Sequence, residues 1–479
     1  MRALFLMHRY LGIAASLVLL LWSLSGIVMV YKQYPVLDHF EKISLLENLH
    51  FDQCCELKYL SFLARDFSKA SVEMLAGDPV VRLKTNDNTL LTYALNGGVF
   101  INAISEERAR VIANQFIRNG QMEGEISGFQ SIHSDQWTID SQYHPHRPLY
   151  KVAVNDEFDT ELYVSSYNGE IVQLTNASQR MWGYLGPVVH WIFPQILREN
   201  NILWRSVVIG LAVIGIFLTT TGLVVGFKQL KVNGSGAEGE SRSPYRSVHL
   251  FHHYLGLVFG VFALAWVASG LLSMNPQGLL ISDSAELESQ RLQQRFLAID
   301  DMALVLGDRE FQRLSNDYVR VDFSMLSGKL SMVAFTADGT QHLLDTNNYE
   351  PVSFPREALQ ILAKKLQPDF PVVSQQLLPQ ADDYYYSRHQ PVEFPIYRVV
   401  LGDIQGSRYY LSPVSGEIVM KVDREARWYR WLFYGLHRLD FSAITRSEPT
   451  RNFFMLLLLA GVSGLCGTGT WLAARRVWK

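Results

Sequence analysis

The chain has 479 residues, with 43 Lys and Arg against 46 Asp and Glu, and a formal net charge of −3 at pH 7. This balance, without any basic tract, argues against a nucleic-acid partner. The three cysteines (Cys54, Cys55 and Cys466) form no C-x-x-C or C-x-x-C-H pattern, which argues against a thioredoxin-like redox role and covalent c-type haem. Adjacent cysteines rarely bridge each other, so no disulfide is expected between Cys54 and Cys55.

Four apolar stretches are long enough to cross a lipid bilayer, which takes about 20 residues. They cover residues 10–31, 203–227, 255–274 and 453–474. The first is too long for the apolar region of a signal peptide, and no small-residue cleavage site follows it. We therefore expect four transmembrane helices, the first of them retained.

Short basic segments predict the orientation of these helices. They comprise Arg2 and Arg9 before the first helix, Lys228, Lys231, Arg242 and Arg246 between the second and third, and Arg475, Arg476 and Lys479 after the fourth. Four crossings put all three segments on one side, and the positive-inside rule makes that side cytoplasmic. We expect a protein of the bacterial inner membrane, with both ends cytoplasmic and two large inserts in the periplasm.

The predicted fold is an α-helical membrane protein in which each pair of helices encloses an α+β domain. The expected parts are residues 1–31 (cytoplasmic start and first helix), 32–202 (first periplasmic domain), 203–227 (second helix), 228–249 (cytoplasmic linker), 250–274 (third helix), 275–451 (second periplasmic domain) and 452–479 (fourth helix and cytoplasmic end). In the inserts, helical patterns at 106–119 and 355–366 precede strand patterns near 149–174 and 397–419. Each insert should contain a helix with a small antiparallel sheet.

The sequence also repeats itself. A shift of 244 residues relates His8-Arg9-Tyr10-Leu11-Gly12 to His252-His253-Tyr254-Leu255-Gly256, Trp22 to Trp266, and Ser25-Gly26 to Ser269-Gly270. A shift of 247 relates Leu149-Tyr150-Lys151-Val152 to Ile396-Tyr397-Arg398-Val399, Asn168-Gly169-Glu170 to Ser415-Gly416-Glu417, and His190 to His437. Two gap-free stretches with nearly equal shifts imply a duplicated unit of helix, exported domain, histidine and helix.

These motifs resemble the PepSY-associated transmembrane proteins, also called iron-regulated or PiuB-like membrane proteins. The resemblance covers nearly the whole chain, and family members include ferric-siderophore reductases that carry two b-type haems. It implies PepSY-like periplasmic domains and two haems b here. Members commonly have Gly soon after the second histidine of each half, whereas Trp191 and Arg438 follow His190 and His437 in this chain.

Neutral imidazole is a good axial ligand for haem iron. His8 and His252 stand at equivalent cytoplasmic helix ends and should form one bis-histidine site. His190 and His437 should form the second near the outer face. The alternative is that all four histidines are interfacial anchors, like the tryptophans and tyrosines at membrane boundaries.

Several other residues allow two interpretations each. His249, His252 and His253 share a helical face and could bind a divalent metal, although the repeat selects His252 as the ligand. His133, His144, His146 and His389 do not repeat; they are expected to be solvated loop residues, with direct contact to iron or a siderophore as the alternative. Trp22 and Trp266 could pack on haem or between helices. The Ser-Gly pairs are expected at close helix contacts.

The expected function is haem b electron transfer that reduces ferric-siderophore iron at the periplasmic face. No catalytic acid, base or nucleophile is required. The donor should be a membrane quinol or another protein, since no G-x-G-x-x-G motif follows a strand in the cytoplasmic segments. The alternative is a non-enzymatic membrane protein whose PepSY-like modules bind a partner or regulate a peptidase. A metal or siderophore transporter is disfavoured because no charged residues mark a path at the membrane centre.

Overall fold

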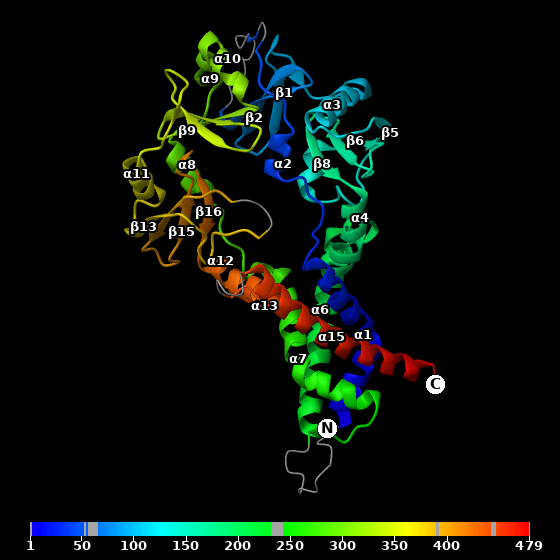
Figure 1. The fold of residues 1–479 in the computed structure, drawn as a ribbon. Coiled ribbons are helices and arrows are strands. Elements are labelled where there is room, and N and C mark those ends of the chain that lie inside the picture. Colours follow the sequence, from blue (N-terminus) through cyan, green and yellow to red (C-terminus); the bar gives the residue numbers. More distant parts are fainter. Residues whose placement is uncertain are drawn as a thin grey trace. The chain divides into compact units, whose positions relative to one another are not determined.

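The computed structural model describes residues 2–51, 54–55, 66–230, 243–388, 392–441 and 447–478 (Figure 1). The chain divides into two compact units. The membrane-helix unit comprises Met1–Tyr34, Ser178–Ile281 and Glu425–Lys479, and the insert unit comprises Pro35–Ala177 and Ser282–Arg424.

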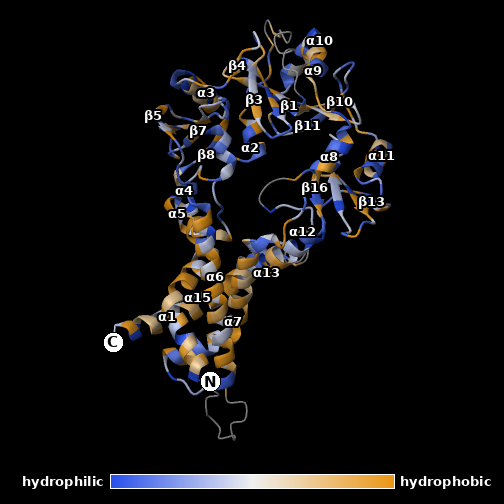
Figure 2. Cartoon of the chain, turned by 180° about the vertical axis from the view of Figure 1, so that it is seen from behind, coloured by the Kyte–Doolittle hydropathy of each residue, from blue (hydrophilic) through white to orange (hydrophobic). Residues whose placement is uncertain are grey.

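Four long helices form the membrane-helix unit: α1 (Arg2–Met29), α6 (Asn201–Gln229), α7 (Val248–Ser273) and α15 (Glu448–Val477). They contain 28, 29, 26 and 30 residues, and each is apolar enough to cross a membrane. At a rise of about 1.5 Å per residue, each exceeds the roughly 30 Å hydrocarbon core of a bilayer. Figure 2 colours most of the residues along these helices as hydrophobic. The four predicted spans are therefore confirmed as helices, each with somewhat different bounds.

The long helices pack as a bundle in which α1 and α7 each contact both α6 and α15. Helices α1 and α7 therefore face each other across the bundle. Its buried centre contains small and apolar side chains, namely Ala15, Leu19, Leu218, Ala263, Val462 and Cys466. Small residues let transmembrane helices approach closely, which membrane bundles need because lipid provides no hydrophobic driving force between helices.

Short elements lead into α6 and α15 in the same order. They are α4 (Ala177–Gly183), the π-helical turn η3 (Tyr184–Val188) and α5 (Gln195–Arg198) in the first case, and α12 (Arg424–Tyr429), the π-helical turn η6 (Arg430–Gly435) and α13 (Leu436–Arg438) in the second. A 3₁₀ turn, η4 (Pro276–Gly278), follows α7. Each π-helical turn ends two residues before His190 or His437. Such turns are rare and often occur at functional sites.

The insert unit contains an eight-stranded antiparallel sheet in the order β12-β11-β10-β9-β1-β2-β3-β4. Its strands are β1 (Phe67–Leu75), β2 (Asp78–Thr85), β3 (Leu90–Ala94), β4 (Phe100–Ile101), β9 (Arg320–Leu326), β10 (Lys329–Phe335), β11 (Gln341–Leu344) and β12 (Pro351–Val352). The central pair, β1 and β9, comes from different inserts, with Val72 opposite Val321. The two inserts, which the sequence described as separate domains, thus share one sheet.

Two four-stranded antiparallel sheets complete the insert unit, each with a helix. One consists of β5 (Ile126–Ile132), β6 (Leu149–Val154), β7 (Glu161–Ser165) and β8 (Ile171–Thr175) with helix α3 (Glu106–Asn119). The other consists of β13 (Val372–Leu378), β14 (Ile396–Leu401), β15 (Arg408–Leu411) and β16 (Ile418–Val422) with helix α11 (Arg356–Leu366). The predicted module of a helix with a small sheet is present in both inserts. The remaining helical elements are α2 (His39–Ser44), η2 (Ser141–His146), α8 (Glu286–Gln293), α9 (Ile299–Leu306), α10 (Arg309–Leu314) and η5 (Ser315–Asp317).

The two small sheets hold the loops before β6 and β14 in the same way. Tyr163 Oη donates a hydrogen bond to Asp135 at 2.7 Å, and Tyr410 Oη donates one to Asp382 at 2.8 Å. Both residues of the second pair lie 247 positions after those of the first. These partly buried carboxylate contacts fix each loop on its sheet.

Buried ion pairs lie inside the insert unit. Arg82 and Arg320 both face the Glu73 carboxylate, which connects β2 and β1 of one insert to β9 of the other. The carboxylate of Glu170 pairs with Lys42. Burial alone would raise the pKa of Glu170, but Lys42 and Arg82 outweigh it and hold that pKa well below its usual range.

The expectation for the adjacent cysteines is wrong: Cys54 and Cys55 form a disulfide. The peptide bond between them is cis, and their Cα atoms are 3.1 Å apart. A trans bond would separate these atoms by about 3.8 Å. Cys466 is a buried free thiol in α15.

Candidate functional site

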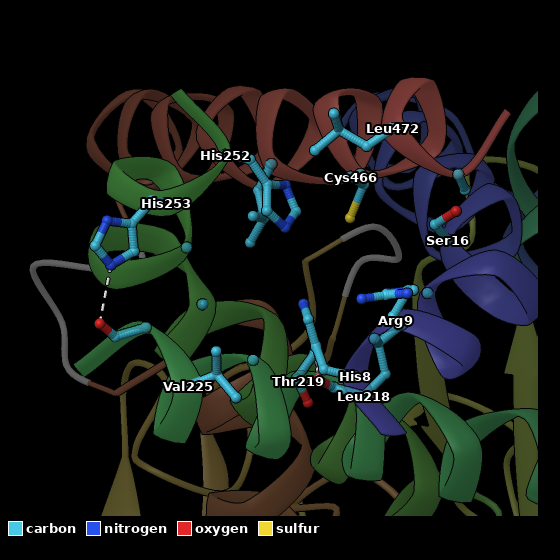
Figure 3. Close-up of a pocket in the computed structure, with 18 of the residues that line it drawn as sticks. His8, Arg9, Ser16, Leu218, Thr219, Val225, His252, His253, Cys466 and Leu472 are labelled. Atoms are coloured by element: carbon cyan, nitrogen blue, oxygen red, sulfur yellow. Dashed lines mark hydrogen bonds between the residues drawn. The ribbon is translucent and has the colours of Figure 1, made fainter. Parts of the chain in front are cut away.

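The first two predicted ligands meet inside the membrane-helix bundle. His8 extends from α1 and His252 from α7, and their ring centroids are 6.2 Å apart with 38° between the ring planes. Figure 3 shows the two side chains on opposite walls of one cavity. The cavity has a volume of about 380 Å³, within the range of small-molecule and cofactor sites.

The lining of this cavity is mostly apolar and includes many small residues. It includes Gly12, Ile13, Ser16 and Leu19 of α1, Leu218, Gly222, Leu223 and Gly226 of α6, Gly256, Gly260 and Ala263 of α7, and Leu465, Cys466, Gly469 and Leu472 of α15. Arg9, Tyr245, His249, His253 and Arg476 also contribute. No Asp or Glu belongs to the lining among the residues described. The start of α1, the start of α7 and the end of α15 therefore lie at one end of the cavity.

The other two predicted ligands also meet. The rings of His190 and His437, which follow the π-helical turns η3 and η6, have centroids 6.0 Å apart at an angle of 74°. The turn η3 packs against α1, and η6 packs against α7. The structure thus brings the four histidines together as the two pairs that the repeat predicted.

Each imidazole lies against a glycine of a neighbouring helix. A Cβ added to Gly222 would lie 2.7 Å from Cε1 of His8, and one added to Gly469 would lie 3.2 Å from Cε1 of His252. A Cβ added to the repeated Gly26 or Gly270 would lie 3.6 Å from Cε1 of His190 or 3.5 Å from Cε1 of His437, respectively. The sequence predicted close helix contacts at the Ser-Gly pairs. The structure shows that these glycines lie within van der Waals contact distance of imidazole rings.

The ring separations suit two imidazoles bound to one metal ion. Metal–imidazole bonds are about 2 Å long, and the ring centre lies about 1 Å beyond the nitrogen. Two rings on opposite sides of one iron therefore have centroids about 6 Å apart. The observed values of 6.2 Å and 6.0 Å match this distance, so the residues present fit bis-histidine ligation at both sites.

Hydrogen bonds at Nδ1 determine which nitrogen of each ring is available to bind a metal. Nδ1 of His8 lies 3.1 Å from the Leu218 carbonyl, and Nδ1 of His190 lies 3.1 Å from the Trp22 carbonyl. His437 makes the same contact with its own backbone acceptor at 3.2 Å, the carbonyl of Trp266. Because a carbonyl only accepts, Nδ1 must carry the proton, and Nε2 keeps the lone pair that binds a metal.

Hydroxyl groups extend this pattern to His252 and reinforce it in the outer pair. Thr468 Oγ1 donates to the Leu465 carbonyl at 2.8 Å, so it accepts from Nδ1 of His252, 3.1 Å away. Ser25 likewise donates within its own helix and lies 3.2 Å from Nδ1 of His190. Ser269 lies 3.1 Å from Nδ1 of His437. Sequence reasoning missed this role, although the repetition of Ser25 as Ser269 was the signal that could have revealed it.

The neighbouring histidines of α7 are arranged differently from His252. His253 uses both ring nitrogens, one with Ser243 Oγ at 2.7 Å and one with the Gly226 carbonyl at 2.9 Å, the latter marked in Figure 3. His249 stacks on Tyr245. Within the described ranges, no group of three or more His, Cys, Asp or Glu residues could hold a metal ion. The three histidines that share this face of α7 therefore lie in three different environments.

The non-repeated histidines belong to the insert unit. His133 and His144 are exposed, and His146 is half-buried with Nδ1 3.9 Å from Glu170. Burial lowers the pKa of His146, which keeps it neutral near pH 7. His389 lies outside the described residues.

Trp22 and Trp266 pack against the buried centre of the helix bundle. Their backbone carbonyls contact the outer histidine pair. The chain matches none of the protein-family models, curated proteins or solved structures with which it was compared.

Proposed function

We propose that the chain is a haem b electron-transfer protein, with one haem held by His8 and His252 and a second by His190 and His437. The observation that carries this proposal is that both pairs combine the ring separation and the tautomer needed for bis-imidazole ligation. When bound, haem supplies a one-electron couple between ferric and ferrous iron. The chain supplies the axial nitrogens and the hydrogen bonds that orient them.

The topology forms the second part of the proposal. The protein spans a bacterial inner membrane, and the basic segments at the ends of the long helices face the cytoplasm. The insert unit then lies in the periplasm, and its two helix-and-sheet modules are PepSY-like. The equal shifts between matching segments support an origin by internal duplication.

The two imidazole pairs lie at different depths of the bundle, which supports electron transfer across the membrane. On α1, His8 is 14 residues (22 − 8) from Trp22, whose carbonyl contacts His190. This interval corresponds to a rise of about 21 Å in an α-helix. Two cofactors spaced in this way divide a hydrocarbon core of about 30 Å into shorter steps.

The reaction in this proposal is the reduction of ferric iron held by a siderophore at the periplasmic face. Ferrous iron is bound less tightly by hard oxygen ligands, so reduction releases the metal. The electrons come from a membrane quinol or another protein, since the cytoplasmic segments carry no dinucleotide-binding motif. The chain then needs no nucleophile or acid–base pair for the reaction itself.

The test is a haem assay on the purified full-length protein and two matched variants. We expect two low-spin b haems per chain in oxidised and dithionite-reduced spectra, and reoxidation when a ferric siderophore is added. His252→Ala should remove one haem, whereas His249→Ala, on the same helix, should keep both.

Three results would contradict the proposal. A colourless protein from haem-replete cells would favour the partner-binding alternative and leave the histidines as interfacial anchors. Equal haem loss in both variants would refute His252 as the specific ligand. Reduced haem that a ferric siderophore does not reoxidise would refute the assigned acceptor.

A further inference from the structure

The inner cavity has a cationic rim at the end where α1 begins and α15 ends. Arg9 follows His8 directly, and Arg476 lies seven residues, or about two helical turns, beyond Gly469 on the cavity-lining face of α15. Helices α1 and α15 are packed neighbours, so the two arginines lie on adjacent walls. Both residues line a cavity that is otherwise largely apolar.

Within the described ranges, neither arginine faces an acidic side chain in the cavity lining. No carboxylate lines the cavity among the described residues, and Arg9 is oriented by the Phe5 ring, with its guanidinium carbon 5.6 Å from the ring centroid. Cations that face an apolar cavity without a counter-ion favour an anionic ligand. Arginine is especially suited to carboxylates, which its planar fork binds through two parallel hydrogen bonds.

We propose that Arg9 and Arg476 bind the two propionate carboxylates of the inner haem and turn that edge of the ring toward their end of the cavity. This inference rests on the proposed function, since it assigns the groups that orient the same cofactor. Both arginines are positioning residues that leave the iron to His8 and His252.

The positions related to these arginines by the repeat cannot take the same role. Arg9 corresponds to His253, whose two ring nitrogens already bind Ser243 and the Gly226 carbonyl. Arg476 corresponds to the uncharged Gln229. The cations therefore lie on only one of two otherwise matching sides. Two equivalent imidazoles alone would accept haem with its propionate edge toward either side. The asymmetric placement of the arginines selects one of these two orientations.

The experiment titrates haem-free full-length protein with haem and with haem dimethyl ester, in which both propionates are blocked. The variants are Arg9→Gln, Arg476→Gln and the double substitution. Arg2→Gln and Arg475→Gln serve as controls, because they remove charges from the same helix ends but do not line the cavity. A His437→Ala background restricts uptake to the inner pair, and the wild-type background shows that the effect does not depend on this change.

We expect each cavity substitution to weaken haem binding roughly tenfold or more, as loss of a charge-assisted hydrogen bond does, and the double variant to weaken it further. Binding of the dimethyl ester should change little, and both controls should bind haem like the parent protein. The midpoint potential of the bound haem should also shift in the cavity variants alone, because a nearby charge has been removed.

Equal weakening for haem and its ester would overturn the inference and would indicate that the arginines serve the fold or bind anionic lipid headgroups. Equal effects in cavity and control variants would overturn it in favour of general surface charge. A protein that binds haem normally without either arginine would refute this inference and leave the proposed function intact. A protein that never binds haem would refute both.

Discussion

At the scale of single residues, the protonation of His252 depends on where the Thr468 hydroxyl donates its hydrogen. Thr468 has one hydroxyl hydrogen, and it is directed to a backbone carbonyl of its own helix. The oxygen can therefore only accept from His252, which fixes the protonated nitrogen of that ring. A group that accepts a hydrogen bond from the other nitrogen of a metal-binding histidine orients the ring and raises its basicity.

Thr468→Val keeps the shape of the side chain but removes the hydroxyl oxygen that accepts a hydrogen bond from His252. We expect roughly tenfold weaker haem binding at the inner site, at the lower end of the range for losing a hydrogen-bond partner of a metal ligand. Haem titration of the purified variant measures this change. Thr470→Val is the matched control, because Thr470 donates to the Cys466 carbonyl in the same helix. If both variants bind haem equally well, the hydroxyl of Thr468 has no special role.

At the scale of elements, the sequence predicted the long helices and the helix–sheet modules because their hydrophobic patterns are long and regular. It also predicted which histidines lie close together, since His8 and His252 occupy repeated positions. It did not predict the π-helical turns η3 and η6, which depend on a local widening of the helix that no residue pattern marks. The glycines that contact the imidazoles were recognised only as sites of close packing.

A prediction follows for helix α6, where two glycines differ in their surroundings. A Cβ at Gly222 would collide with the His8 ring, whereas one at Gly210 would meet nothing within 4 Å. Gly222→Ala should displace His8 and abolish most haem binding at the inner site. Gly210→Ala should keep the haem and stabilise the helix by up to about 1 kcal/mol.

Absorption spectra and thermal unfolding of the two α6 variants separate these effects. Retention of both haems in Gly222→Ala would show that His8 does not need the close approach to this helix.

At the scale of the whole molecule, the insert unit is joined by strand pairing that the sequence did not reveal. Strands β1 and β9 lie about 250 residues apart in the chain and pair through backbone groups, so side-chain patterns alone cannot identify them as partners. The pairing covers an edge that each half-sheet would otherwise expose. The Glu73 carboxylate, facing Arg82 and Arg320, adds a buried charge contact across the same boundary.

The ion pairs of Glu170 and Glu417 predict how this unit responds to mutation. The two glutamates occupy repeated positions, but Glu170 and Lys42 are largely buried, whereas Glu417 and Lys69 are about a third to two-fifths exposed. Glu170→Gln should lower the free energy of unfolding by about 3 kcal/mol, because Lys42 and Arg82 lose a buried counter-charge. Glu417→Gln should cost less than about 1 kcal/mol, the range for exposed pairs. Denaturant unfolding of the full-length protein measures both values.

The same group gives the insert unit an acid-sensitive stability. Because the pKa of Glu170 is held below its unfolded value, its stabilising contribution is complete above about pH 5 and is lost as the pH falls through the unfolded value near 4.3 toward the folded one. Between pH 6 and pH 3, Glu170→Gln should therefore lose stability less steeply than the parent protein. If the free energy of unfolding fell equally steeply with pH in both proteins, Glu170 would not be the source of this acid sensitivity.

Each imidazole pair takes one ring from the chain before the connection between α6 and α7 and one from the chain after it. A half-length ancestor could therefore have assembled these sites only as a twofold homodimer, with like imidazoles meeting across the symmetry axis. In the proposed origin by internal duplication, fusion of two copies would make the partnership permanent and allow each half to change alone. The difference between Arg9 and His253 at matching positions would be one such divergence, which identical subunits could not carry.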